Sequence, residues 1–467
     1  MNSYKKLLNN SFVFAIGSLG SKIINIILVP IYTYYLSAQE YGSVDILITT
    51  VSMLLPIVSF SMYDAVLRFA MNKNSNKTII FSNALFITTI GLILSLSFWP
   101  FFKYFGLEIN HLPYFYLILF GQVFERLLAH YARGIGKVKV FALNGVILTF
   151  STGILNIIFL VFLKLGIEGY LLSMVFAYTI TISYLIYNIK PSNIIKIKVI
   201  NSTTIKKLLK YSVPLIPNAL MWWIINASSR YFILFYVGLS ANGLFAVASR
   251  IPTFINLISQ VFSQAWQLSA IEEYENQGNS DFYSKIFQNF ISLMFISSSV
   301  IILIIKPLLY YVFAVEYYES WKVVPFLLLG VVFSSFSSFL GAIFIATKET
   351  KEVFKTSIYG GIVSLLLNYI LIPIFGLIGA GIASMSSFFV MFLLRYVIVN
   401  KYIFIKIELK FLINYLILLS LQIIVLFINF SLLLEFVIQI IIVLYLIYYN
   451  RKLFLNLFKI LLNKSTK

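Results

Sequence analysis

The fold is decided by long apolar runs, such as residues 412–429, LINYLILLSLQIIVLFIN, and residues 432–449, LLLEFVIQIIIVLYLIYY. A helical run of about this length spans the hydrocarbon core of a bilayer. Residues 81–97 form a similar run in the first quarter of the chain. Over all 467 residues, 60% are hydrophobic and 11% are charged, whereas soluble proteins carry about 25% charged residues. The sequence therefore predicts an all-α protein that crosses a membrane repeatedly.

Working outward from these runs, hydropathy predicts about fourteen spanning helices. The expected spans are residues 11–36, 43–69, 79–102, 113–132, 141–163, 168–188, 212–238, 243–267, 286–305, 323–346, 357–374, 377–399, 409–429 and 431–449. An even number of spans places both termini on one side of the membrane.

The basic residues indicate which side that is. Of the 35 lysines and arginines, 27 fall on one set of loops and span ends and four on the opposite set. Because cytoplasmic loops are enriched in Lys and Arg, we expect both termini in the cytoplasm and the protein in the inner membrane. The net charge of +19 is thus a signature of topology, and a nucleic-acid partner is not expected.

The two halves of the chain contain matching segments. Residues 36–42, LSAQEYG, follow the first span, and residues 239–243, LSANG, follow the seventh. Asn156 before residues 166–169, GIEG, is matched by Asn368 before residues 376–379, GLIG. Because six spans separate these segments, the copies share one orientation, as in transporters built from parallel repeats.

The repeat predicts three parts of the chain. Residues 1–199 form an N-terminal lobe of six spans, and residues 200–403 form a C-terminal lobe of six. Residues 404–467 then hold two appended spans and a basic tail, expected to be an amphipathic helix on the inner leaflet.

Polar side chains follow one face of the first two spans of each half, and polar groups in a membrane usually face a protein interior or a water-filled cavity. Hydrogen bonding between helices across a dry interface is the alternative for the hydroxyl and amide groups. The candidate cavity-lining residues at helical spacing are Asn25, Asp45, Asn218, Trp222, Asn226, Asn256 and Gln260.

Three cations accompany these stripes, namely Lys22, Arg230 and Arg250. Lys22 lies near the centre of its span, roughly 15 Å from the nearest interface, and a lysine stem does not comfortably reach that far. For the two arginines, snorkelling to the interface remains open. Arg and Lys recognise phosphate oxygens, and Asp45 is the only acid in the stripes. We therefore expect a cationic cavity that binds an anion.

A separate polar cluster lies in the fourth span, where Glu125, Arg126 and His130 occur close together. Pairing between helices is the favoured interpretation, and a role in ion coupling is the alternative. The chain has no cysteine and only two histidines. We expect no metal site, no cofactor and no catalytic residues.

Several segments resemble the Wzx-type O-antigen and polysaccharide flippases. They include residues 209–217, LKYSVPLIP, followed by Trp222 and Arg230, and residues 317–325, YYESWKVVP. Tyr41-Gly42 and residues 346–350, ATKET, are also similar to the family. In place of an acidic residue common before the arginine in that family, this chain has Ser229.

The resemblance implies the multidrug/oligosaccharidyl-lipid/polysaccharide exporter fold, with two six-helix bundles around a central cavity. It also implies the substrate, an undecaprenyl-diphosphate-linked oligosaccharide of O-antigen or capsule type, and partners among membrane lipids and polysaccharide polymerase or assembly proteins. A lipid II flippase and a drug or ion antiporter are alternatives of the same fold. A membrane glycosyltransferase, a polymerase or an assembly scaffold is the alternative from another class.

Overall fold

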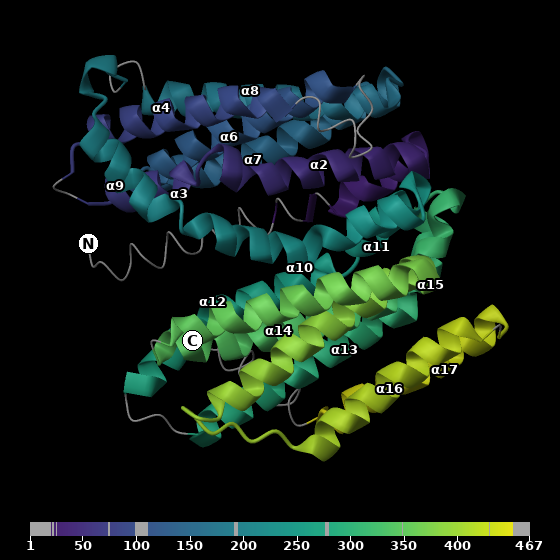
Figure 1. Ribbon diagram of the computed structural model, residues 1–467. Helices are drawn as coiled ribbons and strands as arrows, with labels where there is room; N and C mark the ends of the chain where they lie inside the picture. The colour runs from purple at the N-terminus through teal and green to yellow at the C-terminus, as the bar shows by residue number, and fades with distance from the viewer. Residues whose placement is uncertain are drawn as a thin grey trace, which may run out of the picture. The chain divides into compact units, whose positions relative to one another are not determined.

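The computed structural model describes residues 20, 23–24, 26–72, 75–98, 111–190, 195–275, 280–347, 349–428 and 430–451. In these residues all regular secondary structure is helical (Figure 1). By their contacts, the residues divide into two units, Met1–Ala246 and Val247–Lys467. The lobe boundaries expected from the repeat stay a prediction.

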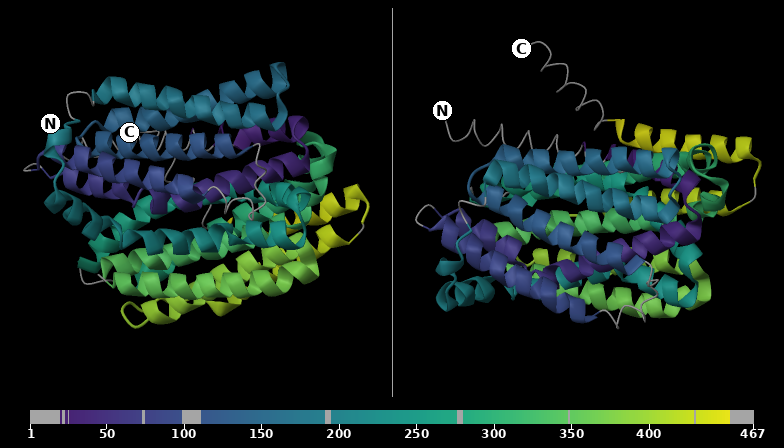
Figure 2. Two further views of the ribbon diagram at one scale, coloured as in Figure 1. Left: turned by 45° about the horizontal axis from the view of Figure 1, so that its top comes forward. Right: turned by 90° about the horizontal axis from the view of Figure 1, so that it is seen from above.

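The first unit contains helices that run alongside one another, as Figures 1 and 2 show. Their bounds are α2 Ala38–Val58, α3 Met62–Ala70, α4 Lys77–Ser95, η1 Leu96–Phe98, α6 Leu112–Gly134, α7 Val138–Asn156, the π-helical η4 Ile157–Phe162, α8 Gly166–Ile189, η6 Ile197–Val199, α9 Ser202–Ser212 and α10 Leu215–Tyr236. Helix α11, Leu239–Arg250, crosses the boundary into the second unit.

The core of the first unit lies where α3, α4, α6, α8 and α9 meet. Met62 and Val66 of α3, Phe81 of α4 and Leu127 of α6 are buried there in one hydrophobic cluster. Phe81 packs on the ring of Tyr131, with the ring centroids 4.5 Å apart. This packing fixes the short helix α3 against the spanning helices.

The predicted span 43–69 is interrupted between α2 and α3. Phe60 and Ser61 have φ values of 48° and 50°, in the left-handed region that side chains rarely adopt. Pro56 provides no amide hydrogen for the helix, and its carbonyl oxygen accepts a bond of 2.9 Å from the amide of Ser61. The expectation of one continuous helix was wrong here, because a turn at residues 59–61 ends α2 before α3 begins.

The second unit is a further helical bundle. Its helices are α12 Thr253–Glu275, α13 Ser280–Val312, η7 Val315–Lys322, α14 Val324–Ala346, α15 Thr350–Val399, α16 Leu409–Phe427 and α17 Leu432–Tyr449. Helices α16 and α17 run side by side at the edge of this unit, next to α13 (Figure 1). They correspond to the two spans predicted to be appended.

Aromatic rings fill the core between α12, α13 and α14. The ring of Trp266 stacks on Phe339 with centroids 4.1 Å apart, and its indole Nε1 donates a 3.0 Å hydrogen bond to the carbonyl oxygen of Phe339. The rings of Phe287 and Phe290 also pack against the ring of Phe339, with centroid distances of 4.6 and 5.7 Å. Rigid rings of this size bury a large apolar area at small entropic cost.

Ten helices of the described residues are long and apolar enough to cross a membrane, or eleven if the bent pair of α11 and the first part of α12 counts as one span. The 50-residue helix α15 contains a kink at Gly376, where φ is 56° and ψ is −129°. The kink separates the predicted spans 357–374 and 377–399. The all-α, multi-pass membrane fold is confirmed, and the number fourteen stays a prediction.

Arg395, which follows the kink at Gly376 in α15, connects this part of α15 to the part before the kink and to α14. Its side chain is 2% exposed. Its guanidinium donates hydrogen bonds to Thr356 Oγ1 at 3.0 Å, Ser357 Oγ at 3.1 Å and the carbonyl oxygen of Ser337 at 2.7 Å. Neutral oxygens thus solvate this cation in the place of water.

We expect Arg395→Met to lower the free energy of unfolding by roughly 3 kcal/mol, because bonds to a charged donor are lost and buried acceptors are left without partners. Thermal unfolding of the purified protein in detergent measures the effect. Arg451→Met is the matched control, since Arg451 is exposed. Equal melting temperatures for the two variants would show that Arg395 does not hold the bundle together.

Candidate functional site

The candidate site includes the start of α2, where residues 37–40 form a helix-capping motif. Ser37 is the N-cap, and its hydroxyl accepts a bond from the amide of Glu40 at 3.3 Å. The Glu40 carboxylate accepts in return from the amide of Ser37 at 2.9 Å. This reciprocal capping box satisfies two amides that a helix start leaves unpaired, and it fixes the register of α2.

Helices α2 and α11 approach each other at their first turns, within the first unit. A Cβ on Gly42 would lie 2.1 Å from the carbonyl oxygen of Leu239, and a Cβ on Gly243 would lie 1.9 Å from that of Ala38. Asn242 Nδ2 donates a 3.1 Å bond to the carbonyl oxygen of Gly42. Only glycine permits backbones to pack this closely. We call these contacts the glycine contact.

The glycine contact is reciprocal. Gly42 touches Leu239, four residues before Gly243, and Gly243 touches Ala38, four residues before Gly42. The matching segments instead align Ala38 with Ala241, because LSA occupies both residues 36–38 and residues 239–241. The contact therefore brings the two segments together, and the internal repeat itself stays a prediction.

Three residues after Gly42 on α2, Asp45 forms an ion pair with Arg230 of α10. Arg230 Nε donates to Asp45 Oδ2 at 2.5 Å, and the two side chains are 14% and 7% exposed. Arg230 Nη1 also donates to the carbonyl oxygen of Asn226 at 3.2 Å, and the guanidinium lies 5.7 Å from the ring centroid of Phe245. The sequence placed Asp45 and Arg230 on one cavity, and the structure brings them into direct contact.

Two hydrogen bonds hold α10 against α2 beside this pair. Trp223 Nε1 donates to the carbonyl oxygen of Thr49 at 3.1 Å. Thr50 Oγ1 lies 2.7 Å from the hydroxyl of Tyr231 and donates its own proton to the carbonyl oxygen of Ile46, so Tyr231 is the donor to Thr50. Polar side chains therefore connect these helices in the manner expected of membrane helices.

The polar face of α10 continues away from the ion pair. Asn218, Trp222 and Asn226 precede Arg230 at four-residue spacing, and all three are exposed. On α2, Thr49 is buried and Ser52 is exposed. An exposed row of amides in contact with hydrocarbon would be costly, and this cost favours a water-filled space beside α10.

The remaining candidates fall elsewhere. Arg250 is the last residue of α11 and is half-buried, while Asn256 and Gln260 are exposed on α12 in the second unit. Lys22 and Asn25 lie outside the described residues. Their predicted roles at the cavity stay predictions.

The cluster in α6 makes contacts between helices. Asn144 Nδ2 of α7 donates a hydrogen bond to Glu125 Oε1. The Arg126 guanidinium lies 5.2 Å from the ring centroid of Tyr63, and the His130 ring packs edge-on against the same ring at 5.3 Å. These contacts connect α6 with α7 and α3, and the coupling role stays a prediction.

We expect Asn144→Ala to lower the free energy of unfolding by about 1–3 kcal/mol, because the Glu125 carboxylate loses its donor. Transport per folded molecule should be unchanged if the cluster only joins helices. Denaturation and transport measured on the same preparation separate stability from activity. Loss of transport at unchanged stability would indicate a coupling role instead.

Sequence reasoning missed Asn242, Thr50 and Tyr231, which tie α2 to α10 and α11. Asn242 stands beside Gly243 in the repeated segment, and that pairing of a small residue with an amide is a usable signal for a close helix contact. Thr50 and Tyr231 have no comparable signal, because their positions follow only from how α2 packs on α10.

The fold and the site define a class, the all-helical membrane proteins with many spans. Residues 7–267 match the polysaccharide biosynthesis protein family, and the chain belongs to that family. No curated protein matches the sequence.

Solved transporter structures share the fold. A structure of the lipid II flippase MurJ in an inward closed conformation has a TM-score of 0.69 at 17% identity, covering 95% of this chain and 100% of that one. An inward-facing MATE multidrug transporter of the MOP superfamily has a TM-score of 0.68 at 16% identity, covering 83% and 98%. The MATE transporter VcmN of Vibrio cholerae has a TM-score of 0.55 at 13% identity, covering 85% and 96%. At these identities, the likeness establishes the fold alone.

Proposed function

We propose that this protein moves an undecaprenyl-diphosphate-linked oligosaccharide, of the O-antigen or capsule type, from the cytoplasmic to the outer leaflet of the inner membrane. The family match supports a role in polysaccharide biosynthesis. The single observation that carries the proposal is the exposed polar face of α10, with Asn226 and Trp222, leading to Arg230.

In this proposal Arg230 recognises the diphosphate. A guanidinium has five N–H donors in a planar fork that matches phosphate oxygens. Asp45 holds the guanidinium through Nε and so fixes the orientation in which it meets the phosphate. Lys22 and Arg250 are predicted to contribute further positive charge.

The neighbouring face of α10 is suited to the sugars. Trp222 is exposed one helical turn from Asn226, and aromatic rings with amides are the groups that provide apolar faces and hydrogen bonds to a glycan. The prenyl chain stays in the lipid, so the apolar tail never enters the water-filled space.

Alternating access is the proposed mechanism. The glycine contact joins the first turns of α2 and α11, at the end that the charge pattern predicts to face outward. The helices must separate at this contact for the head group to be released outside. The contact must then form again for the empty carrier to return to its inward-facing state. A membrane potential negative inside favours outward movement of an anion by about 2.3 kcal/mol per charge per 100 mV.

Lys22→Ala is expected to abolish surface glycan in cells that depend on this protein, with the protein still present in the membrane. The reason is the loss of a predicted cation near mid-membrane, which the head group needs in place of water. Lys139→Ala is the control, since Lys139 is exposed at the start of α7. Wild-type surface glycan with Lys22→Ala would refute the cationic cavity. If this protein restored peptidoglycan synthesis in cells depleted of their lipid II flippase, lipid II would be assigned as the substrate instead.

A further inference from the structure

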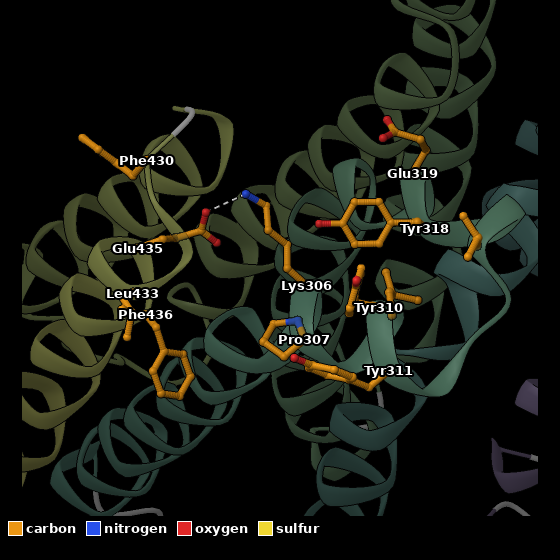
Figure 3. A pocket seen from close by; sticks show the side chains of 12 residues that line it. Lys306, Pro307, Tyr310, Tyr311, Tyr318, Glu319, Phe430, Leu433, Glu435 and Phe436 are labelled. Atoms are coloured by element: carbon orange, nitrogen blue, oxygen red, sulfur yellow. Dashed lines mark hydrogen bonds and ion pairs between the residues drawn. The ribbon is translucent and has the colours of Figure 1, made fainter.

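The second unit contains a cavity of its own. It has a volume of about 810 Å³ and lies between the end of α13, η7 and the turn from α16 to α17 (Figure 3). Sites for small molecules are typically about 300–1,000 Å³. The size of this cavity therefore suits a lipid head group with part of its chains.

The walls indicate that the cavity opens to lipid near a membrane interface. Leu433 of α17 is 81% exposed and Tyr311 of α13 is 77% exposed, and both line it. Tyr310 and Tyr318 line it too, with ring centroids 6.2 Å apart. Tyrosines gather at the level of lipid head groups, and the cavity lies where α13 ends and α17 begins.

The base of the cavity is an ion pair whose cation is already engaged. Lys306 Nζ donates to Glu435 Oε2 at 2.7 Å and to the carbonyl oxygen of Leu426 at 2.7 Å. The same ammonium lies 4.5 Å from the ring centroid of Trp321. With two of its three donors used and an aromatic face against it, Lys306 is poorly placed to bind a phosphate.

Two carboxylates line the cavity, Glu435 and Glu319, and each has a lysine partner. Glu435 is held in the buried pair with Lys306. Glu319 pairs with Lys322 at an exposed position, where such a pair contributes little, so the Glu319 carboxylate is the one that a ligand can engage. Burial raises the pKa of Tyr318, and so do the charges of Glu435 and Glu319. Carboxylates beside tyrosine rings are the groups that recognise an ammonium ion.

From this arrangement we infer that the cavity binds a phospholipid whose head group carries an ammonium, such as phosphatidylethanolamine. The ammonium lies by Glu319 against the rings of Tyr310 and Tyr318, and an acyl chain lies over Leu433. The phosphate faces the water beyond the tyrosines. This lipid is a bound structural ligand of the appended helices, independent of the transported substrate.

Native mass spectrometry of the full-length protein tests the inference, with phosphatidylethanolamine and phosphatidylglycerol of identical acyl chains as the two probes. We expect the wild type to retain phosphatidylethanolamine roughly tenfold better, the ratio that one desolvated ammonium–aromatic contact provides. Glu319→Gln and Tyr310→Ala should each remove this preference. Glu352→Gln, which changes an acid of another ion pair on α15, should leave it unchanged.

The choice of Glu319 and Tyr310 keeps the test independent of folding, because neither residue takes part in the buried Lys306–Glu435 pair. Equal retention of the two phospholipids, or a preference for phosphatidylglycerol, would overturn the inference. So would a preference for phosphatidylethanolamine that survives in both variants. Displacement of the bound lipid by an undecaprenyl diphosphate, but not by phosphatidylethanolamine, would assign the cavity to the transported lipid and contradict our proposal.

Discussion

Gly243→Leu is expected to stop transport while the protein still folds and inserts. The added Cβ would lie 1.9 Å from the carbonyl oxygen of Ala38, and ordinary contact begins near 3.4 Å, so the backbones of α2 and α11 must part by at least about 1.5 Å. The carbonyl oxygen of Ala38 belongs to the backbone and cannot move aside as the end of a flexible side chain could. The strain of overpacking, typically about 1–3 kcal/mol, therefore falls on the glycine contact itself. A carrier that cannot close this end cannot complete alternating access.

Labelling measures the separation directly, because the chain has no cysteine. Ala38 is 1% exposed, so Ala38→Cys should react slowly with an impermeant maleimide added outside. The same cysteine should react readily when combined with Gly243→Leu. Gly42→Leu should act in the same way, since its Cβ would lie 2.1 Å from the carbonyl oxygen of Leu239.

Gly145→Leu is the matched control, because a Cβ on Gly145 has nothing within 4 Å. It should transport at the wild-type rate and leave the Ala38→Cys labelling unchanged. Wild-type transport by Gly243→Leu would mean that the close approach of α2 and α11 is not needed during the cycle.

Replacing both members of the Asp45–Arg230 pair is expected to separate stability from transport. Arg230→Gln alone leaves the Asp45 carboxylate buried without its cation, which typically costs about 3–5 kcal/mol. The double variant Asp45→Asn with Arg230→Gln removes both charges, and its stability should return close to that of the wild type. Transport should remain reduced by at least about 30-fold, since a contact to a charged group is worth about 2–5 kcal/mol.

Thermal unfolding and transport of the two variants are compared on the same preparations. Replacement of the Lys355–Glu352 pair, whose lysine is exposed, by Glu352→Gln with Lys355→Gln serves as the control for removing opposite charges. Full transport by the Asp45→Asn, Arg230→Gln variant would show that the pair is structural only, and Arg230 would then have no part in recognising the substrate.

Much of the fold follows from the sequence because the bilayer imposes simple rules. Apolar runs of spanning length and the separation of basic from apolar segments predict the all-helical, multi-pass fold. The capping box at Ser37 and Glu40 is equally local, since both partners lie within one turn. The repeated segments led to the prediction of a parallel repeat, which stays a prediction, and the structure brings these segments together at the glycine contact.

Other features depend on packing and were not predictable. Asp45 and Arg230 are 185 residues apart, so their spacing predicts a shared polar environment but not an ion pair. The pair also changes the electrostatics that the sequence indicated, since one of the expected cations is neutralised by the one acid of the stripes. The turn at Phe60 and Ser61 was missed because Pro56 alone marks it, and proline is tolerated within membrane helices.

The most direct test of the account is transport by the purified protein in liposomes. The two substrates are an undecaprenyl-diphosphate-linked oligosaccharide and the same oligosaccharide on a neutral polyprenol, each scored by the fraction of glycan that an added lectin or glycosidase reaches. We predict rapid movement of the diphosphate-linked substrate, little movement of the neutral one, and loss of the difference in the Asp45→Asn, Arg230→Gln variant. Equal movement of both substrates by the wild type, or movement no faster than in empty liposomes, would contradict the account.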